Sequence, residues 1–375
     1  MSGQHALLSA SGADRWIHCP PSVRLCENEK DQSTDYAAEG TDAHALCEYL
    51  LNTSLGRQVP DPREGLSHYD QEMQDSAEGY VSYVTDLLEE TRLRCPHPLT
   101  LAEQRVDFSR WAPGGFGTAD CLILADGTMH VVDFKYGKGV AVDADHNPQM
   151  MLYALGALDA FGDLYDAEAV TMTIYQPRRN SISECTLTVQ ELTAWAEETL
   201  KPAAELAYRG EGEFACGAWC RFCKARATCR KRAEENLKLA RMDFAPGPLL
   251  SDEEVAEVLA QIDDLTAWAS DIKAYALSEA IKGREWNGYK LVEGRSNRQY
   301  TDPALAARLV AEAGYDPYEK KLLGITAMTR LLGKKKFGEI LGGCVEKPRG
   351  KPTLVPIDDK RPAVTAAELD FKEET

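Results

Sequence analysis

Two aspartates and a lysine in the middle of the chain have the types and spacing to hold a metal ion beside an ammonium group. Asp120 stands at the head of one expected strand, Asp133 lies near the end of the next, and Lys135 follows two residues later. Neighbouring strands of a hairpin let the two carboxylates share a divalent cation, with Lys135 on the same face. Bound Mg²⁺ lowers the pKa of a water and neutralises charge on a phosphate, while an ammonium group can orient that water. The three residues therefore predict phosphodiester hydrolysis.

A hairpin and a helix are the elements expected to position these side chains. Residues 121–134 contain two short apolar runs with β-branched residues around an Ala-Asp-Gly turn, which predicts the hairpin. Asn147 and Pro148 are typical of a helix start, with Asn as the cap and Pro in the first turn. This helix would place Gln149 and Tyr153 four residues apart on one face, so that both can point at one substrate.

The order of short motifs in this region resembles that of the PD-(D/E)XK nucleases of the RecB type. The motifs are G-x-A-D at Gly117–Asp120, D-x-K at Asp133–Lys135 and Q-x-x-x-Y at Gln149–Tyr153. A single D-x-K is also typical of a solvated strand end, so the succession of motifs carries the resemblance. It implies an α/β fold with a restriction-endonuclease-like core, in which helices flank a central mixed sheet.

The resemblance also implies roles for individual residues. Asp120, Asp133 and Lys135 would be catalytic, with Lys135 positioning the attacking water. Asp120 and Asp133 would hold Mg²⁺ or Mn²⁺, with His44 as an extra ligand and the backbone carbonyl of Phe134 completing the shell. His44 is expected in the first turns of a helix that starts near residue 40, where it could equally be an ordinary partly buried histidine.

A strand predicted near residue 99 carries one more acid of interest. Glu103 is a candidate for the same metal site, and a solvent-facing strand glutamate is the alternative.

Several residues are candidates for holding nucleic acid rather than for chemistry. The resemblance assigns this role to Gln149 and Tyr153, and arginines just after a strand or within a basic run can meet phosphates. The basic run from Arg221 to Arg232 contains no acid, although a cation-rich helix end is an alternative reading. The predicted DNA-binding residues are Gln149, Tyr153, Arg178, Arg179, Arg226 and Arg230.

Four of the eleven cysteines lie close together, which favours metal ligation over disulfides. Cys216, Cys220, Cys223 and Cys229 could form a local zinc site. The alternative is a [4Fe-4S] cluster held by Cys19, Cys220, Cys223 and Cys229, with Cys216 as a spare thiol. The upstream Cys-Pro and the downstream spacing resemble AddB-type and CRISPR-associated nucleases, and this resemblance favours iron-sulfur. Such a cluster would join the start of the nuclease domain to its end.

Length and charge limit the organisation of the protein. A chain of 375 residues predicts two domains, here a nuclease domain at 1–244 and an α-rich accessory domain at 245–375 with an extended proline-containing tail. The formal charge of -18 argues against a broadly basic surface. DNA would then be bound by local basic patches, by metal, or in a channel built by oligomerisation.

The chain has no apolar run long enough to span a bilayer and no signal pattern, which predicts a cytoplasmic protein. The architecture resembles a phage and prophage group related to RecB nucleases, and this resemblance implies a bacterial host cell. The function expected is that of a phage or prophage exonuclease that resects DNA in recombination or replication. DNA, a phage single-strand annealing or recombination protein, and a second copy of the chain are the expected partners. The alternatives are a catalytically inactive DNA-binding or assembly module on the same fold, and a zinc-stapled structural protein.

Overall fold

The computed structural model describes residues 6–29, 35–239, 249–293, 300–318 and 322–345. The chain divides into two compact units, Met1–Ser278 and Glu279–Thr375. The predicted domain boundary between residues 244 and 245 lies outside the described residues, as does the proline-containing tail from residue 346 onward.

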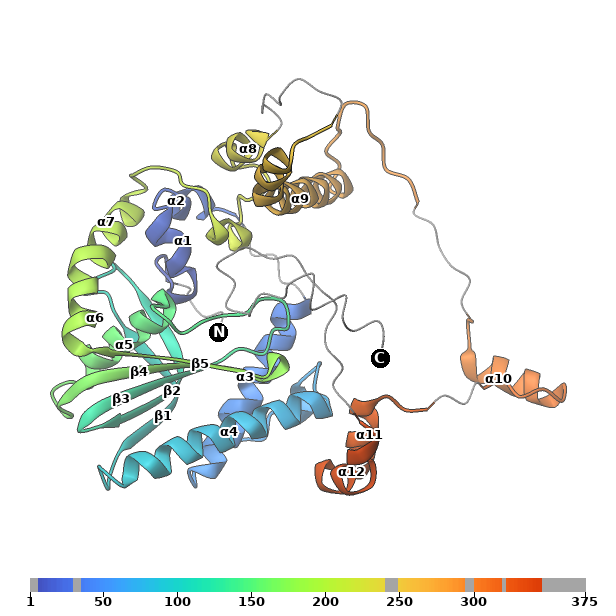
Figure 1. The fold of residues 1–375 in the computed structure, drawn as a ribbon, viewed down its shortest axis with the longest axis horizontal. Coiled ribbons are helices and arrows are strands. Elements are labelled where there is room, and N and C mark those ends of the chain that lie inside the picture. Colours follow the sequence, from blue (N-terminus) through green and yellow to red (C-terminus); the bar gives the residue numbers. More distant parts are fainter. Residues whose placement is uncertain (1–5, 30–34, 240–248, 294–299, 319–321, 346–375) are drawn as a thin grey trace. The chain divides into compact units, whose positions relative to one another are not determined.

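A five-stranded mixed sheet forms the centre of the first unit (Figure 1). Its strands lie in chain order, and β3 and β4 are parallel while the other neighbours are antiparallel. The parallel pair requires a crossover, which the helix α5 supplies. The strands are β1 (Leu99–Asp107), β2 (Phe116–Ala125), β3 (Gly127–Phe134), β4 (Ala167–Gln176) and β5 (Ser181–Thr188).

Helices cover both faces of the sheet, as expected for the predicted α/β class (Figure 1). Alternation along β2 makes this possible, because Leu122 and Leu124 enter one apolar core while Cys121 and Ile123 enter the other. The helices α3 (Asp35–Ser54) and α4 (Gln71–Arg92) pack on one face. The opposite face is covered by α1 (Ala13–His18), α5 (Pro148–Phe161), α6 (Val189–Trp195) and α7 (Lys201–Arg209).

The predicted hairpin of β2 and β3 is confirmed. Asp126 alone separates the two strands, and Gly127 at the turn has a φ of +81°, a left-handed conformation that glycine adopts without steric cost. The predicted start of α5 is also confirmed, because the Asn147 side chain accepts hydrogen bonds from the backbone N–H groups of Gln149 and Met150.

The expected position of His44 in its helix is wrong. The helix α3 begins at Asp35, five residues before the predicted start, so His44 lies near its middle. The start near residue 40 was expected from the helical spacing of apolar residues beginning at Ala45. The polar residues before them are helical as well, because a helix whose later turns pack through Leu46 and Leu51 extends readily toward its N-terminus.

Beyond the sheet, the chain continues through the cysteine-containing segment, which includes η5 (Ala218–Phe222) and α8 (Arg230–Asn236). The long helix α9 (Asp252–Ile281) follows. Ser251 and Glu254 form a reciprocal capping box at the start of α9. No residue of α9 is buried, so its apolar side chains stay at least partly exposed in the described part of the chain.

The regular elements described in the second unit are helices, in agreement with the predicted α-rich accessory domain. They form α10 (Pro303–Glu312), α11 (Ile325–Leu332) and α12 (Lys334–Leu341). Gly333, with a φ of +75°, separates α11 from α12.

Candidate functional site

The register of the hairpin brings Asp120 and Asp133 to the same place. Cys121 pairs with Val132 across β2 and β3, so the next position along the same register sets Asp120 opposite Asp133. The backbone N–H of Phe134 donates a hydrogen bond to Asp120 Oδ2 at 2.7 Å. The two predicted acids therefore lie side by side, as the hairpin prediction required.

Lys135 completes the predicted trio. Its Nζ lies 2.9 Å from Asp133 Oδ2 and 3.1 Å from Asp133 Oδ1, and its backbone N–H donates to the Tyr175 carbonyl, which continues the pairing of β3 with β4. Asp133 is only 1% exposed. Its Oδ2 is buried without a hydrogen bond of good geometry, although the ammonium group is near. A buried carboxylate oxygen in this state is costly, and a cation would offset that cost.

Two further side chains complete a group of potential metal ligands. His44 Nδ1 lies 3.3 Å from Asp120 Oδ1 and 3.9 Å from Glu103 Oε1. One ligand atom from each of the three residues lies within 4.8 Å of the other two. The register of β1 and β2 sets Glu103 opposite Asp120, and Glu103 has a φ of 46°, a conformation uncommon for residues with a side chain and enriched at functional sites. Glu103 is therefore close to Asp120 and His44 and is not an isolated solvent-facing strand residue.

The charges of the group are strongly coupled. Burial raises the pKa of Asp133, and burial together with the nearby Asp120 raises the pKa of Glu103 to about 7. Burial also opposes ionisation of Asp120, but the charges of His44 and Lys135 outweigh it and hold the pKa of Asp120 below its usual value. Burial likewise opposes protonation of His44, yet the pKa of His44 is raised because Asp120 attracts the proton. The site thus combines three acids with two cationic groups, and a bound divalent cation would favour the ionised forms of Asp133 and Glu103.

Gln149 and Tyr153 lie beside the acids on α5. Gln149 Nε2 is 3.4 Å from Asp133 Oδ1 and donates a hydrogen bond to the Tyr153 hydroxyl at 3.0 Å. Burial raises the pKa of Tyr153 to about 12, which keeps the phenol neutral. A Cβ at Gly117 would lie 2.7 Å from a Tyr153 ring carbon, so the glycine of the G-x-A-D motif makes room for this ring.

The side chain of Phe134 packs against one of the potential metal ligands. It is fully buried, and its ring meets the His44 ring edge-on at a centroid separation of 5.6 Å. The Phe134 ring also stacks with the Tyr136 ring, with a centroid separation of 6.0 Å. This packing holds the imidazole toward Asp120.

The two arginines after β4 differ in their surroundings. Arg178 Nη1 and Nη2 lie 2.9 Å from Glu39 and 3.2 Å from Glu72, and its guanidinium sits 4.3 Å from the Tyr136 ring centroid. Its charge is therefore already balanced by acids. Arg179 is exposed, and its side chain donates a hydrogen bond to the backbone carbonyl of Lys138.

A second predicted group comes together around a small pocket. Cys19, Cys220, Cys223 and Cys229 all line it, although Cys19 precedes the others by about two hundred residues. Trp219 stacks on His18 with ring centroids 4.3 Å apart, which joins the two segments. The structure thus brings together the four cysteines expected to hold an iron-sulfur cluster.

The cysteine sulfurs of this region approach one another in pairs. Cys216 and Cys220 have sulfurs 3.8 Å apart, and Cys26 and Cys223 have sulfurs 3.7 Å apart. No three cysteine sulfurs lie within 4.8 Å of one another, a statement that covers all eleven cysteines because each is among the described residues. Tetrahedral zinc holds thiolates about 3.8 Å apart, a separation that Cys216 and Cys220 have. Neither the zinc set nor the iron-sulfur set has three sulfurs in close contact, so these separations favour neither set.

Cys26 was missed by the sequence reasoning. It is buried, and its thiol shares a hydrogen bond with Cys223, which lowers the pKa of Cys26. Its position at the end of α2 (Ser22–Cys26), one short helix after Cys19, was the available signal.

The basic run near the cysteines is less free than its sequence indicates. Arg226 Nε lies 3.0 Å from Asp271 of α9, and Arg232 pairs with the same carboxylate. Lys231 pairs with Glu235. The run itself contains no acid, but acids from later in the chain fold back and pair with several of its cations. Arg230 remains exposed.

The fold is that of a mixed α/β protein with a five-stranded sheet and a separate helical part. The chain belongs to the family described as "Protein of unknown function (DUF2800)", whose profile matches residues 5–362. Among solved structures, that of a protein designated SSO0001 is 16% identical and aligns over 50% of this chain and 95% of the other, with a TM-score of 0.21. So low a TM-score carries no argument about fold or function.

In the described part of the chain, no helix combines the length and apolar character that crossing a membrane requires.

Proposed function

We propose that this protein is a metal-dependent DNA nuclease with a PD-(D/E)XK core. The observation that carries the proposal is the convergence of Asp120, Asp133 and Lys135, with the Lys135 ammonium group 2.9 Å from the buried Asp133 Oδ2. Asp120 on β2 lies opposite Asp133 on β3, and Lys135 directly follows the end of β3. The pairing of the two strands therefore fixes the spacing of the three side chains. A retired site would have no reason to keep two acids and a lysine together.

The residues present fit a hard divalent cation. Asp120, Asp133, Glu103 and the Phe134 carbonyl would supply the oxygen ligands, and His44 would supply a nitrogen. When bound, Mg²⁺ or Mn²⁺ lowers the pKa of a water and neutralises charge on the phosphate. Lys135 holds the attacking water through its ammonium group, while Gln149 and Tyr153 offer an amide and a neutral phenol to the nucleic acid.

Exonuclease action in phage recombination or replication is the specific activity proposed. It is supported by the motif order, which resembles RecB-type nucleases, rather than by a feature of the site. Of the arginines, Arg179 and Arg230 are the better candidates for phosphate contacts, because Arg178 and Arg226 are already paired with acids. Two candidate arginines are few phosphate contacts, which agrees with the formal charge of -18 of the protein.

The cysteine pocket supports a structural [4Fe-4S] cluster held by Cys19, Cys220, Cys223 and Cys229. The pocket is lined by Cys19 together with the three downstream cysteines, whereas Cys216 is not among its lining residues, so its lining fits the iron-sulfur set better than the local zinc set. The cluster would close a loop of about two hundred residues, and its loss would loosen the whole nuclease unit.

The test is cleavage of labelled DNA by the purified full chain in Mg²⁺ or Mn²⁺, with EDTA as the control. Linear duplex, linear single strand and closed circles are compared. An exonuclease degrades the linear substrates and spares the circles. Binding without cleavage on every substrate would instead identify an inactive DNA-binding module.

A further inference from the structure

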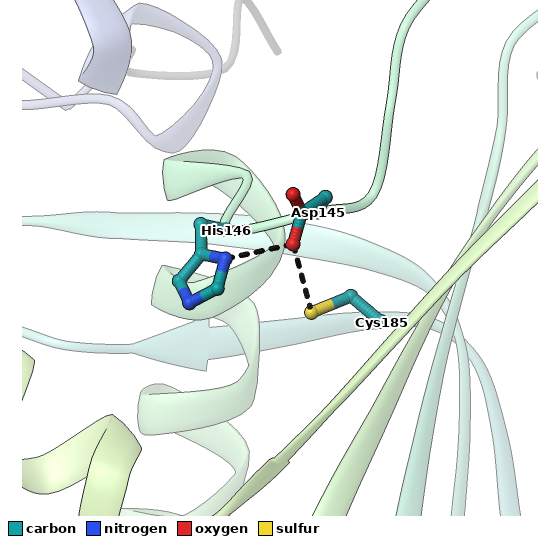
Figure 2. Close-up of side chains that lie close together, drawn as sticks. All are labelled: Asp145, His146 and Cys185. Carbon is teal, nitrogen blue, oxygen red and sulfur yellow. Dashed lines mark hydrogen bonds and ion pairs between the residues drawn. The ribbon is translucent and has the colours of Figure 1, made fainter. Parts of the chain in front are cut away.

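Three potential metal ligands meet at a place unrelated to the sequence motifs (Figure 2). Asp145 and His146 belong to the loop that leads into α5, and Cys185 lies in β5. Asp145 Oδ1 is 2.7 Å from His146 Nδ1 and 3.8 Å from Cys185 Sγ. One ligand atom from each residue lies within 4.8 Å of the other two. Figure 2 shows that the side chains point toward one another from the two segments.

The loop is fastened to β5 beside this group. The Ser183 hydroxyl donates to Asp143 Oδ1 at 2.6 Å and accepts a hydrogen bond from the Ala144 backbone N–H at 2.9 Å. Ser183 and Cys185 are two residues apart, so they project to the same face of β5. The Ser183 bonds therefore hold the two segments side by side without using the ligand atoms, so a metal ion would not need to bring the segments together.

We propose that Asp145, His146 and Cys185 form a binding site for a transition-metal dication of the zinc class. A thiolate, an imidazole and a carboxylate are ligands that Zn²⁺ accepts together, whereas Mg²⁺ disfavours thiolates. In a tetrahedral zinc site, ligand atoms lie about 3.3–3.8 Å apart. Asp145 Oδ1 and Cys185 Sγ are already 3.8 Å apart, whereas Asp145 Oδ1 and His146 Nδ1, now hydrogen-bonded at 2.7 Å, would move apart by a small side-chain rotation. The fourth position is left to water, because Asp145 and His146 are both about two-thirds exposed.

This site would act on the helix that carries two candidate DNA ligands. His146 directly precedes Asn147, the cap of α5, and Gln149 and Tyr153 follow in the first turns. A bound ion would tie the start of α5 to β5. It would differ from the site at Asp120 and Asp133 in ligands and in metal preference, and it does not depend on the nuclease proposal.

Cobalt(II) is the probe, because a thiolate bound to Co²⁺ gives a charge-transfer band in the near ultraviolet. The full-length protein, with its cysteine pocket unchanged, is titrated with Co²⁺ and compared with C185S, H146Q and D145N. C95S and H97Q are the matched controls, since Cys95 is half-buried like Cys185 and His97 is exposed like His146. Any Co²⁺ held in the cysteine pocket contributes equally to all six proteins.

The expected result is that C185S, H146Q and D145N each lose about one molar equivalent of Co²⁺ relative to the unmodified chain. C185S should also lose the corresponding thiolate band, and excess Zn²⁺ should abolish that band in the unmodified chain. C95S and H97Q should titrate as the unmodified chain does. Identical titrations for C185S, H146Q and the unmodified chain would overturn the proposal. Because D145N and H146Q change exposed side chains, the test remains valid if C185S folds poorly.

Discussion

The backbone N–H of Phe134 donates its hydrogen bond to the side chain of Asp120, at 2.7 Å. One oxygen of this carboxylate thus joins β2 to the end of β3, while the other oxygen lies 3.3 Å from His44 Nδ1. Asp120 therefore has a structural role and a proposed metal-binding role on different atoms, and the two can be separated by substitution.

Asp120→Asn and Asp120→Ala should differ in stability but not in activity. Asparagine keeps an oxygen that accepts the Phe134 hydrogen bond, whereas alanine leaves this buried N–H unsatisfied. We expect Asp120→Ala to be less stable than Asp120→Asn by about 1–2 kcal/mol in chemical denaturation. Both should lack metal-dependent cleavage, because both remove the charge. Equal stability of the two variants would show that the hydrogen bond does not contribute.

Glu103 should make the metal-free protein less stable as the pH rises. Its pKa is raised from 4.5 to about 7 by burial and by Asp120, so between those values the folded chain binds more protons than the unfolded chain. Stability from this group is present below pH 4.5 and is lost as the pH rises through 7. We expect Glu103→Gln to match the unmodified protein near pH 4.5 and to exceed it at pH 8 by on the order of 2 kcal/mol. Denaturation in metal-free buffer at both pH values measures this difference, and a constant difference would contradict it.

His44 should contribute to metal affinity, and more for Mn²⁺ than for Mg²⁺, because Mg²⁺ takes oxygen ligands almost alone. His44→Gln should weaken Mn²⁺ binding at least about tenfold and leave Mg²⁺ binding less affected. His68, which pairs with Asp42 and Asp35 on the same side of the sheet, offers His68→Gln as the matched control. Calorimetric titration of both ions distinguishes a ligand from a histidine that only packs on Phe134, since the latter would affect both ions equally.

Local patterns were enough to predict the parts of the fold that depend on short-range order. The hairpin, the cap at Asn147 and the strand that carries Glu103 each have a signal within a few residues. The convergence of Asp120, Asp133 and Lys135 followed from strand geometry alone. Cys19 was matched to the downstream cysteines only through the resemblance to known nucleases.

Long-range pairing is what the sequence could not provide. Asp271 pairs with Arg226 and Arg232 from about forty residues away, and the group of Asp145, His146 and Cys185 exists only because β5 lies beside the loop before α5. The left-handed conformation of Glu103 has no local signal either. Each depends on tertiary packing that periodicity and capping rules do not contain.

Cys19→Ser and Cys216→Ser should separate the two cysteine sets. If iron-sulfur ligation holds, Cys19→Ser loses iron, visible absorbance and stability, whereas Cys216→Ser keeps all three. Metal content is measured by elemental analysis of protein purified without oxygen. Zinc without iron in the unmodified protein, with zinc lost in Cys216→Ser and kept in Cys19→Ser, would favour the zinc-stapled alternative.

The most direct test of the nuclease proposal compares Lys135→Ala with Lys138→Ala on labelled linear duplex DNA in Mn²⁺. Lys135 lies 2.9 Å from Asp133, whereas the nearby Lys138 is exposed and pairs with Glu72. We predict that the unmodified chain and Lys138→Ala degrade the DNA at similar rates, and that Lys135→Ala is slower by about 100-fold or more while remaining folded. Cleavage by Lys135→Ala at the unmodified rate, or no cleavage by the unmodified chain, would contradict the proposal.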